Sequence, residues 1–414
     1  MPSPQVIVAQ IGARRHYAVP RIYFDAGMLA GLFTDLCATK GWPRLVRTCV
    51  PARLQPAGLR RLCSRIPHGV PADKITSFGR LGLDIYRRRR KVSSVAEGID
   101  LDLWAGSALC SAIVASGLPA VDLVHAFCPG GLELVRESKK RGMRGIVEQT
   151  NAPAAVVTRI ISEENSRFAG YIVHPEKNDL WKKLADREYA EWEAADRIVC
   201  ASQFVLDGIR QVGGPVEKVV VVPSGVEVPR APVIRRKRKP GSGIHVLFVG
   251  RVDLRKGAHY LIEAARMLKG TDVSIRICGP NFLTPEALKD LPPNLTLTGR
   301  ITRSEVARQY EWADIFCLPT LCEGSAMVNY EAMAMGLPVI TTPNAGSIVQ
   351  DGVNGYVFRA RDAGAIVEAI EKCRVKMDDS GIPFPLWAES PPDYSLEAYG
   401  NRLIEAARGV LSQK

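Results

Sequence analysis

At 414 residues, with 46% hydrophobic and 24% charged residues, the chain has the composition of a globular protein and enough length for two domains. This composition excludes a largely disordered or low-complexity protein. The ten cysteines form no Cys-x-x-Cys pair, which argues against a disulfide framework or a zinc site and favours a reducing compartment. No charged segment precedes a long apolar run at the start, so no signal peptide is predicted.

The formal net charge of +12 is concentrated in short stretches. Residues 44–91 contain 13 Lys and Arg but only two acids, Asp73 and Asp84, and five basic residues follow one another at 235–239. The chain therefore has a local basic face rather than a uniformly basic surface. No aromatic-interleaved groove or recognised motif favours nucleic acid as its anionic partner.

The N-terminal residues predict the first strand, glycine loop and helix of a doubly wound α/β sheet. Residues 5–11 form an apolar run typical of a buried strand, Gly12 follows, and a helix is expected from about Pro20. A glycine here would let the backbone approach a ligand, but a plain turn glycine fits the same pattern.

The basic stretch contains a predicted amphipathic helix at 59–66, which Pro67 ends. Its apolar residues recur at helical spacing, and its arginines lie off that face. Such a helix is typical of contact with an anionic membrane, where each basic side chain contributes on the order of 1 kcal/mol. The basic run at 86–91 favours this interpretation over a solvated helix packed on the sheet.

The next segments predict further parallel strands and one apolar helix. Residues 103–121 are interrupted by Gly, Ser and Pro, so we expect a buried helix ending near Gly117 rather than a membrane span of about 20 apolar residues. Strands are expected at 121–127 and 145–147, and the polar loop 148–153 is a candidate acceptor site at a strand end. A helix, a strand, a helix capped by Ser202 and a last strand at 218–225 follow.

The second half predicts another sheet with a cationic loop. Residues 229–243, rich in basic residues, Pro and Gly, are interpreted as a linker. A strand at 245–250 leads into Arg251 and Lys256, which in a loop at a helix start can hold a diphosphate. The stretch 322–342 then predicts loop, helix and strand, with Glu323 at the mouth of the helix and Glu331 about two turns further along. The first-turn amides of that helix are a place for an anion.

The stretch CEGSAMVNYEAMAMGLPVI resembles the E-x7-E motif of the retaining GT-B glycosyltransferases of family 4. G-R-x4-K-G at 250–257 and the segment 188–202 also match, and the resemblance covers nearly the whole chain, most specifically 245–358. It implies an α/β protein with two Rossmann-like domains facing a cleft. The expected boundaries are 1–230 for the N-terminal domain, 231–243 for the linker and 244–390 for the C-terminal domain, with the helix 394–414 crossing back to the first domain.

The resemblance also implies roles for individual residues. Glu323, Arg251 and Lys256 would be catalytic, with the two cations stabilising the departing diphosphate and Glu323 binding the donor sugar. Glu331 would bind the ribose, and no metal is expected. The remaining donor-binding residues would be Gly12, Gly250, Gly279, Pro280, Ser325, Ala326, Met327 and Val328.

Several positions depart from the family pattern, among them Glu227 in place of an Asp and residues 344–350, which lack paired glycines and a Glu; three others lie near the expected ligands. Phe127 stands where relatives have the second His of D-x-x-H-x-H, Gln149 stands near another family His, and Gly12 lacks a paired glycine. These departures put any histidine-assisted step in doubt.

The expected reaction moves a sugar from a UDP- or GDP-linked donor to an acceptor hydroxyl, with retention. A lipid-linked saccharide or a growing surface polysaccharide would be the acceptor, at the cytoplasmic face of a membrane that residues 44–91 contact. Two other readings stay open: a non-catalytic protein that binds anionic lipid or polymer on the same scaffold, and a sugar-nucleotide epimerase.

Overall fold

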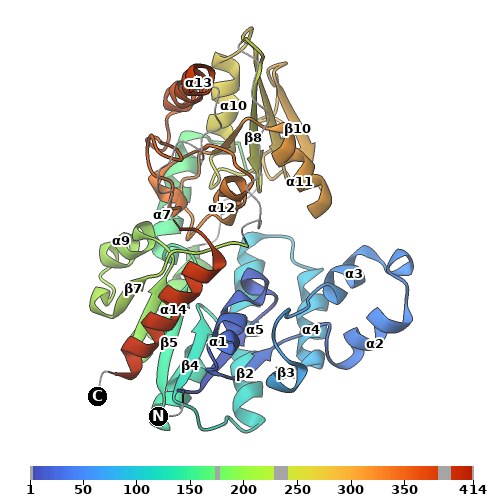
Figure 1. Cartoon of the computed structure of the whole chain (residues 1–414), viewed down its shortest axis with the longest axis vertical. Coiled ribbons are helices and arrows are strands. Elements are labelled where there is room, and N and C mark those ends of the chain that lie inside the picture. The colour runs from blue at the N-terminus through green and yellow to red at the C-terminus, as the bar shows by residue number, and fades with distance from the viewer. Residues whose placement is uncertain (1–2, 173–177, 228–240, 381–392, 413–414) are drawn as a thin grey trace.

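A computed structural model describes residues 3–172, 178–227, 241–380 and 393–412 of the chain. Two parallel sheets lie one above the other along the long axis of the molecule, with helices on their faces (Figure 1). The first sheet has seven strands in the order β3-β2-β1-β4-β5-β6-β7, and the second has six in the order β10-β9-β8-β11-β12-β13.

The strands of the first sheet are β1 (Val6–Gln10), β2 (Leu29–Thr34), β3 (Ile75–Ser77), β4 (Leu123–Phe127), β5 (Arg144–Gln149), β6 (Arg197–Cys200) and β7 (Val219–Val221). Those of the second are β8 (Ile244–Val249), β9 (Val273–Cys278), β10 (Leu295–Gly299), β11 (Ile315–Leu318), β12 (Val339–Thr341) and β13 (Gly355–Val357). The strands β1, β4 and β11 are buried along their whole length, as expected for parallel strands covered on both faces.

The helices before residue 228 are α1 (Ala18–Asp25), α2 (Gly41–Cys49), α3 (Ala57–Cys63), α4 (Gly79–Arg89), α5 (Val95–Ala115), α6 (Leu132–Lys140), α7 (Ala154–Arg167), α8 (Asn178–Ala194) and α9 (Gln203–Gln211). Those after residue 240 are α10 (Ala258–Met267), α11 (Arg303–Trp312), α12 (Met327–Ala334), α13 (Ala363–Ser380) and α14 (Leu396–Leu411). Short 3-10 helices lie at Arg14–Tyr17, Ala52–Leu54, Ala72–Lys74, Val216–Lys218 and Pro343–Ala345.

Both sheets reverse their strand order at one point, between β1 and β4 in the first and between β8 and β11 in the second. In doubly wound sheets, ligands bind outside the carboxyl ends of the strands at such switch points. The chain therefore has two candidate ligand positions, one on each sheet.

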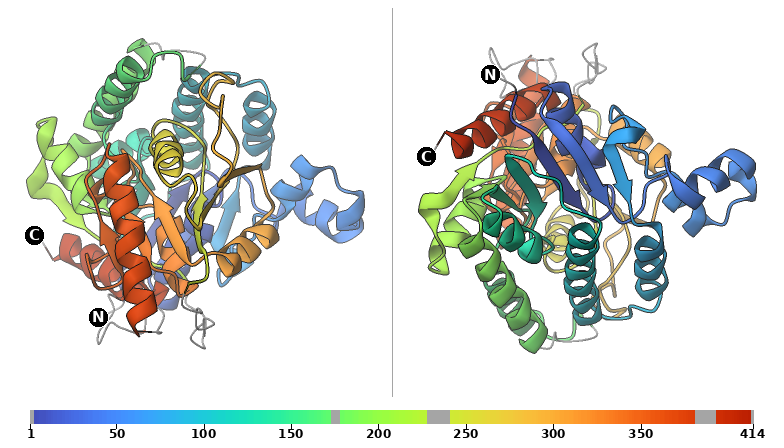
Figure 2. Two further views of the ribbon diagram at one scale, coloured as in Figure 1. Left: turned by 90° about the horizontal axis from the view of Figure 1, so that it is seen from above. Right: turned by 90° about the horizontal axis from the view of Figure 1, so that it is seen from below.

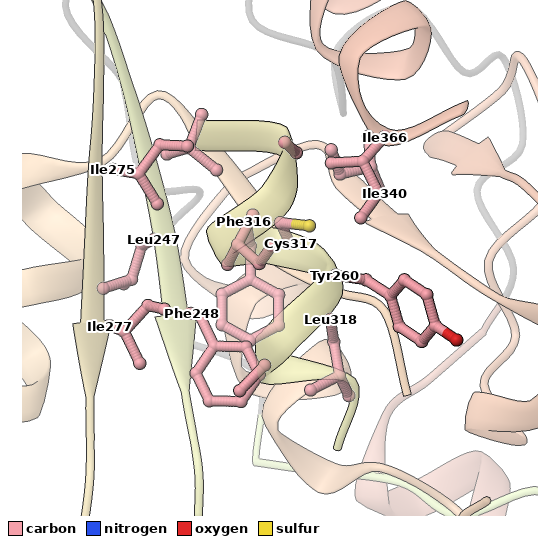
Figure 3. Close-up of a cluster of buried hydrophobic side chains, with 14 of the residues drawn as sticks. Leu247, Phe248, Tyr260, Ile275, Ile277, Phe316, Cys317, Leu318, Ile340 and Ile366 are labelled. Atoms are coloured by element: carbon pink, nitrogen blue, oxygen red, sulfur yellow. The ribbon is translucent and has the colours of Figure 1, made fainter. Parts of the chain in front are cut away.

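The second sheet is held by an apolar core that its helices share with one helix of the first half. Figure 3 shows Phe248, Phe316 and Leu318 beside Tyr260, with Ile275 and Ile277 on the neighbouring strand. The first turns of α7 belong to the same cluster, because Val156, Val157 and Ile160 pack into it. Each fully buried large side chain stabilises the fold by about 1.5–3 kcal/mol, so α7 fastens the two halves together.

The last helix returns to the first half. In α14, Tyr399, Leu403, Ala407 and Val410 are buried in the cluster that contains β1 and α1 (Figure 1). Ser395 caps this helix by accepting a hydrogen bond from the Ala398 amide. The apolar face of α14 thus completes the first domain rather than the second, as the sequence resemblance implies.

The helices α2 and α3 stand out from the side of the first sheet (Figures 1 and 2). We refer to residues 41–63 as the α2–α3 lobe. In the same half, α5 passes a length and hydropathy test for a membrane span, with 33% of its apolar window buried. Its Leu109, Cys110 and Ile113 pack on the first sheet, and it ends at Ala115, close to the predicted end at Gly117.

The predicted linker falls mostly at residues 228–240, which lie outside the described residues, so the domain boundaries stay a prediction. The ten cysteines all lie inside the described residues, and each is a free thiol there. The predicted cap is confirmed, since the Ser202 side chain accepts a hydrogen bond from the Val205 amide at the start of α9.

Candidate functional site

The loop after β8 is organised around Asp253. One carboxylate oxygen accepts a hydrogen bond from Arg251 Nε at 2.9 Å, and the other accepts one from the Lys256 amide at 2.9 Å. The Arg251 guanidinium also lies 4.0 Å from the centre of the Phe282 ring. Asp253 therefore fixes both predicted diphosphate-binding residues in one short turn, while the Arg251 side chain stays 45% exposed.

The carboxylate of Glu323 meets this loop directly. Lys256 Nζ lies 2.8 Å and an Arg255 guanidinium nitrogen 3.4 Å from Glu323 Oε1. Burial alone would raise the pKa of the Glu323 carboxyl, but Lys256 and Arg255 outweigh burial and lower that pKa below its usual value. Glu323 is thus an ionised, 8% exposed acid beside two cations.

The helix that follows, α12, begins without a side-chain cap. The amide of Ala326 was expected to bind an anion, but it donates to the Ala345 carbonyl at 2.9 Å, so this expectation is wrong. Met327 and Val328 are the first two helical residues, whose amides have no intrahelical acceptor. Of the predicted hydrogen-bond donors at the helix start, these two amides and the Ser325 hydroxyl therefore remain. The Ser325 hydroxyl donates to Tyr330 Oη at 3.2 Å.

Glu331 lies further along α12 and is held from outside the helix. Tyr310 on α11 donates its hydroxyl to Glu331 Oε2 at 3.1 Å. Burial, with the nearby Glu331 charge, raises the pKa of Tyr310, so this phenol stays a donor. The second carboxylate oxygen is left for a ligand hydroxyl group.

The two glycines at the ends of β8 and β9 pack backbone on backbone. A Cβ on Gly279 would lie 1.7 Å from the Gly250 carbonyl oxygen, and Gly279 has a φ of +151°. The Pro280 carbonyl next to it accepts the Val252 amide. This contact brings the Gly279–Pro280 turn beside the Arg251 loop, as expected for residues that line one ligand.

The loop after β1 lies at the switch point of the first sheet. The Gly12 amide donates to Asp35 Oδ1 at 2.8 Å, and a Cβ on Gly12 would face open space. Arg15 forms an ion pair with Glu148 at 2.7 Å and a hydrogen bond with Ser224 Oγ at 2.7 Å. Glu148 also contacts His125 Nε2 at 3.3 Å, so the Glu148 carboxylate already has two partners within the protein.

The two residues that replace family histidines behave differently from each other. Phe127 is buried, and Arg14 lies over its ring at 5.5 Å. Gln149 is buried and fully used by the scaffold, because its amide donates to Glu188 and Asn151 and its oxygen accepts from Trp192. In the predicted acceptor loop 148–153, Gln149 therefore positions helices rather than a ligand.

The two halves touch at the loop that carries Glu323. Ser202 Oγ donates to the Gly324 carbonyl at 2.7 Å. A Cβ on Gly324 would lie 2.0 Å from the Thr150 carbonyl oxygen, so only glycine permits this approach. The second-half site thus sits against the ends of β5 and β6 in the first half.

Comparison with known sequences agrees with this geometry. Residues 243–374, which include Arg251, Lys256, Glu323 and Glu331, match the family described as "Glycosyl transferases group 1".

Over residues 243–374 the chain is therefore similar to the glycosyl transferases group 1 family.

The curated relatives of this chain include enzymes of polysaccharide synthesis. A putative colanic acid biosynthesis glycosyltransferase of Salmonella typhimurium is 26% identical over 63% of both chains. An amylovoran biosynthesis glycosyltransferase of Erwinia amylovora is 32% identical over 37% of this chain and 42% of its own. The glycogen synthase of Mycobacterium tuberculosis is 27% identical over 54% of this chain and 55% of its own. The matches therefore span less than two thirds of these relatives.

Solved structures share the fold over the whole chain. Anabaena Alr3699/HepE, in complex with UDP and glucose, superposes with a TM-score of 0.57 at 15% identity, covering 98% of this chain and 100% of its own. The sucrose-phosphate synthase of Thermosynechococcus elongatus gives 0.60 at 16% identity, covering 99% and 100%. The predicted GT-B class is confirmed by the two parallel sheets together with these full-length neighbours.

The sequence did not single out several residues of the candidate site. Asp253, Arg255 and Tyr310 hold or flank Arg251, Glu323 and Glu331 in the structure. Asp253 and Arg255 lie between the two predicted cations, so an acid and a third cation in that loop were the available signal. The sequence carried no signal for Tyr310, because this residue contacts α12 only in the folded protein. In the described ranges no three His, Cys, Asp or Glu residues cluster as a metal site, and metal independence stays a prediction.

Proposed function

We propose that the protein is a retaining glycosyltransferase that moves a sugar from a UDP- or GDP-linked donor to an acceptor hydroxyl group. The observation that carries the proposal is the contact of Glu323 with Lys256 beside Arg251, at the switch point of the second sheet. A diphosphate placed there would replace the carboxylate as a partner of these cations. Glu323 would then be free to accept hydroxyl groups of the donor sugar.

In this proposal the chemistry is electrostatic. As the bond to the anomeric carbon breaks, negative charge develops on the leaving phosphate, and Arg251, Lys256 and the amides of Met327 and Val328 stabilise it. Glu331 holds the ribose, with Tyr310 fixing its orientation. The contact between Gly324 and Thr150 keeps water away from the reacting atoms by closing one side of the site.

The proposal is tested first by nucleotide binding. Calorimetry and thermal shift with UDP, GDP and ADP should identify one nucleotide that stabilises the full chain. The double variant Arg251→Ala/Lys256→Ala should weaken its binding by about 100-fold or more, since two charge-assisted contacts are lost. The matched control, Arg266→Ala/Lys269→Ala, removes two exposed cations of the same domain and should bind like the wild type. Equal binding by both double variants would contradict the proposal.

The same preparation separates the alternatives. Release of free sugar or of an epimerised nucleotide sugar without any acceptor would favour hydrolysis or epimerisation over transfer. Absence of nucleotide binding, with lipid or polymer binding retained, would favour a non-catalytic protein on this scaffold.

We further propose that the acceptor is a lipid-linked saccharide or growing surface polysaccharide, reached at the cytoplasmic face of a membrane through the α2–α3 lobe. The sequence has no acid at 36–72, and the lobe exposes five arginines: Arg44, Arg47, Arg53, Arg60 and Arg61. Leu45 and Leu54 are 65% and 67% exposed among them. Basic and apolar side chains together suit an anionic lipid surface.

Vesicle sedimentation tests this second proposal. The full chain should sediment with vesicles containing anionic phospholipid and far less with neutral vesicles, and added salt should release it. Leu45→Ser/Leu54→Ser should weaken sedimentation, whereas Val375→Ser, at an exposed apolar position of the second half, should not. Equal recovery on neutral vesicles would contradict the proposal.

A further inference from the structure

Arg14 lies at the switch point of the first sheet, where its charge faces the Phe127 ring and forms no ion pair with any residue that the structure describes. It follows β1 by four residues, and its guanidinium lies 5.5 Å from the ring centre of Phe127, the last residue of β4. These are the two strands between which the strand order reverses. Arg14 therefore stands where a doubly wound sheet places its ligand.

The neighbouring Arg15 shows what a structural arginine looks like in this loop. Arg15 bonds with Glu148 and Ser224 and lies over the Tyr399 ring at 5.1 Å. Arg14, in contrast, makes no hydrogen bond or ion pair within the described part of the chain, and its buried Nε has no acceptor. Burial lowers the pKa of Arg14, although Glu148 opposes that change.

Two nearby acids raise the pKa of Arg14, but neither forms an ion pair with it in the described part of the chain, and each has another cation as its partner. Glu148 is shared by Arg15 and His125, and Asp102 pairs with Arg89 at the surface. Leaving a buried charge without a partner costs several kcal/mol, so such a group is retained where a ligand supplies the counter-charge. The planar fork of an arginine fits a carboxylate or phosphate through two parallel hydrogen bonds.

We infer that Arg14 binds a carboxylate or phosphate group of the acceptor, so that the enzyme glycosylates an acidic saccharide. The inference rests on the proposed transfer function and names its substrate class. The diphosphate of the donor is assigned to the second sheet, where Arg251 and Lys256 lie. The first sheet then receives the acceptor, and Arg14 is the specificity-determining residue there.

Paired acceptors test the inference. With the donor identified above, the full chain is assayed on methyl glucuronide against its methyl ester, and on glucose 6-phosphate against glucose. The wild type should prefer the acidic member of at least one pair by about tenfold or more in kcat/KM, expressed mainly in KM. Arg14→Gln should reduce that ratio to about one. Arg136→Gln, an exposed arginine on α6, should keep the wild-type ratio.

Two measurements keep a negative result informative. Calorimetry with UDP or GDP shows which anion Arg14 meets: a loss in Arg14→Gln as large as in Arg251→Ala/Lys256→Ala would assign Arg14 to the donor and overturn the inference. An enzyme that transfers sugar to neutral and acidic acceptors equally would also overturn it, while leaving the proposed function intact.

The second measurement needs no substrate. Since Arg14 is half-buried and has no ion pair in the described part of the chain, Arg14→Met should melt at the same temperature as the ligand-free wild type or higher, because removing such a charge is neutral or stabilising. Arg15→Met should melt several degrees lower, since it leaves Glu148 without its cation. A destabilised Arg14→Met would show that Arg14 is structural and would overturn the inference.

Discussion

Glu323 in the second half and the pair Glu188 and Glu191 in the first half are buried acids that the protein holds in opposite ways. In the second half, Glu323 is surrounded by Lys256 and Arg255, and its pKa is lowered although burial opposes this. In the first half, burial raises the pKa of Glu188 and Glu191 to about 7, and both mainly accept backbone and amide hydrogen bonds. Glu191 caps α6 by accepting the amides of Gly131 and Leu132. The contrast separates an ionised acid beside two cations, proposed to bind the donor, from carboxyl groups that hold helices.

The largest effect on activity is expected at Glu323. Glu323→Gln should lower kcat by about 100- to 1000-fold, because the neutral amide neither balances the two cations nor accepts donor hydroxyl groups as strongly. Steady-state transfer rates and circular dichroism together check this. Wild-type turnover in a folded variant would remove Glu323 from the proposed site.

A smaller effect is expected at the helix-capping acid. Glu191→Gln should be more stable relative to the wild type at pH 8 than at pH 5, by about 1–3 kcal/mol, because one pKa unit is worth about 1.4 kcal/mol. The sign follows from the raised pKa: the folded wild type keeps the proton up to about pH 7, whereas the unfolded carboxyl loses it near its ordinary value, so stability falls between these values. Urea unfolding at both pH values measures the difference. A pH-independent difference would mean that Arg187, 3.5 Å away, already stabilises the ionised form.

The smallest effect is expected at Tyr310, whose proposed role is only to orient Glu331. Tyr310→Phe should weaken nucleotide binding by about two- to tenfold, as for one lost hydrogen bond to a charged group. Calorimetry with the nucleotide and with its free base distinguishes the causes. Since Glu331 is assigned to the ribose, the affinity for the free base should not change. An equal loss for both ligands would contradict that assignment.

The sequence was sufficient for the half in which short motifs carry the family resemblance. G-R-x4-K-G and the Glu323–Glu331 spacing place the predicted site residues on two loops and one helix, and the second sheet follows from alternating strands and helices. Strand β1, the Ser202 cap and the last helix were predicted for the same reason, since local patterns determine them. The amide of Ala326 was assigned wrongly because its acceptor, the Ala345 carbonyl, lies in a separate loop.

The first half depended on contacts between distant segments, which no local pattern encodes. Its position at a strand end made Gln149 a predicted ligand-binding residue, yet its side chain is hydrogen-bonded to Glu188 and Trp192 on α8. Arg14 and Arg15 are indistinguishable in sequence, and only the fold gives one of them an acid and leaves the other without one. The acceptor side was therefore the less predictable side of the molecule.

The bond between Ser202 and the Gly324 carbonyl has a mechanical consequence. Glu323 is covalently next to the residue through which the two sheets touch, so a movement that parts the sheets pulls on the backbone beside this carboxylate. Under the proposed function, admission of a fresh donor and relaxation of the loop beside its sugar would be a single motion. A glycosyl donor bound to the parted form would lack the loop geometry needed for its own cleavage and would be protected until the acceptor alcohol binds.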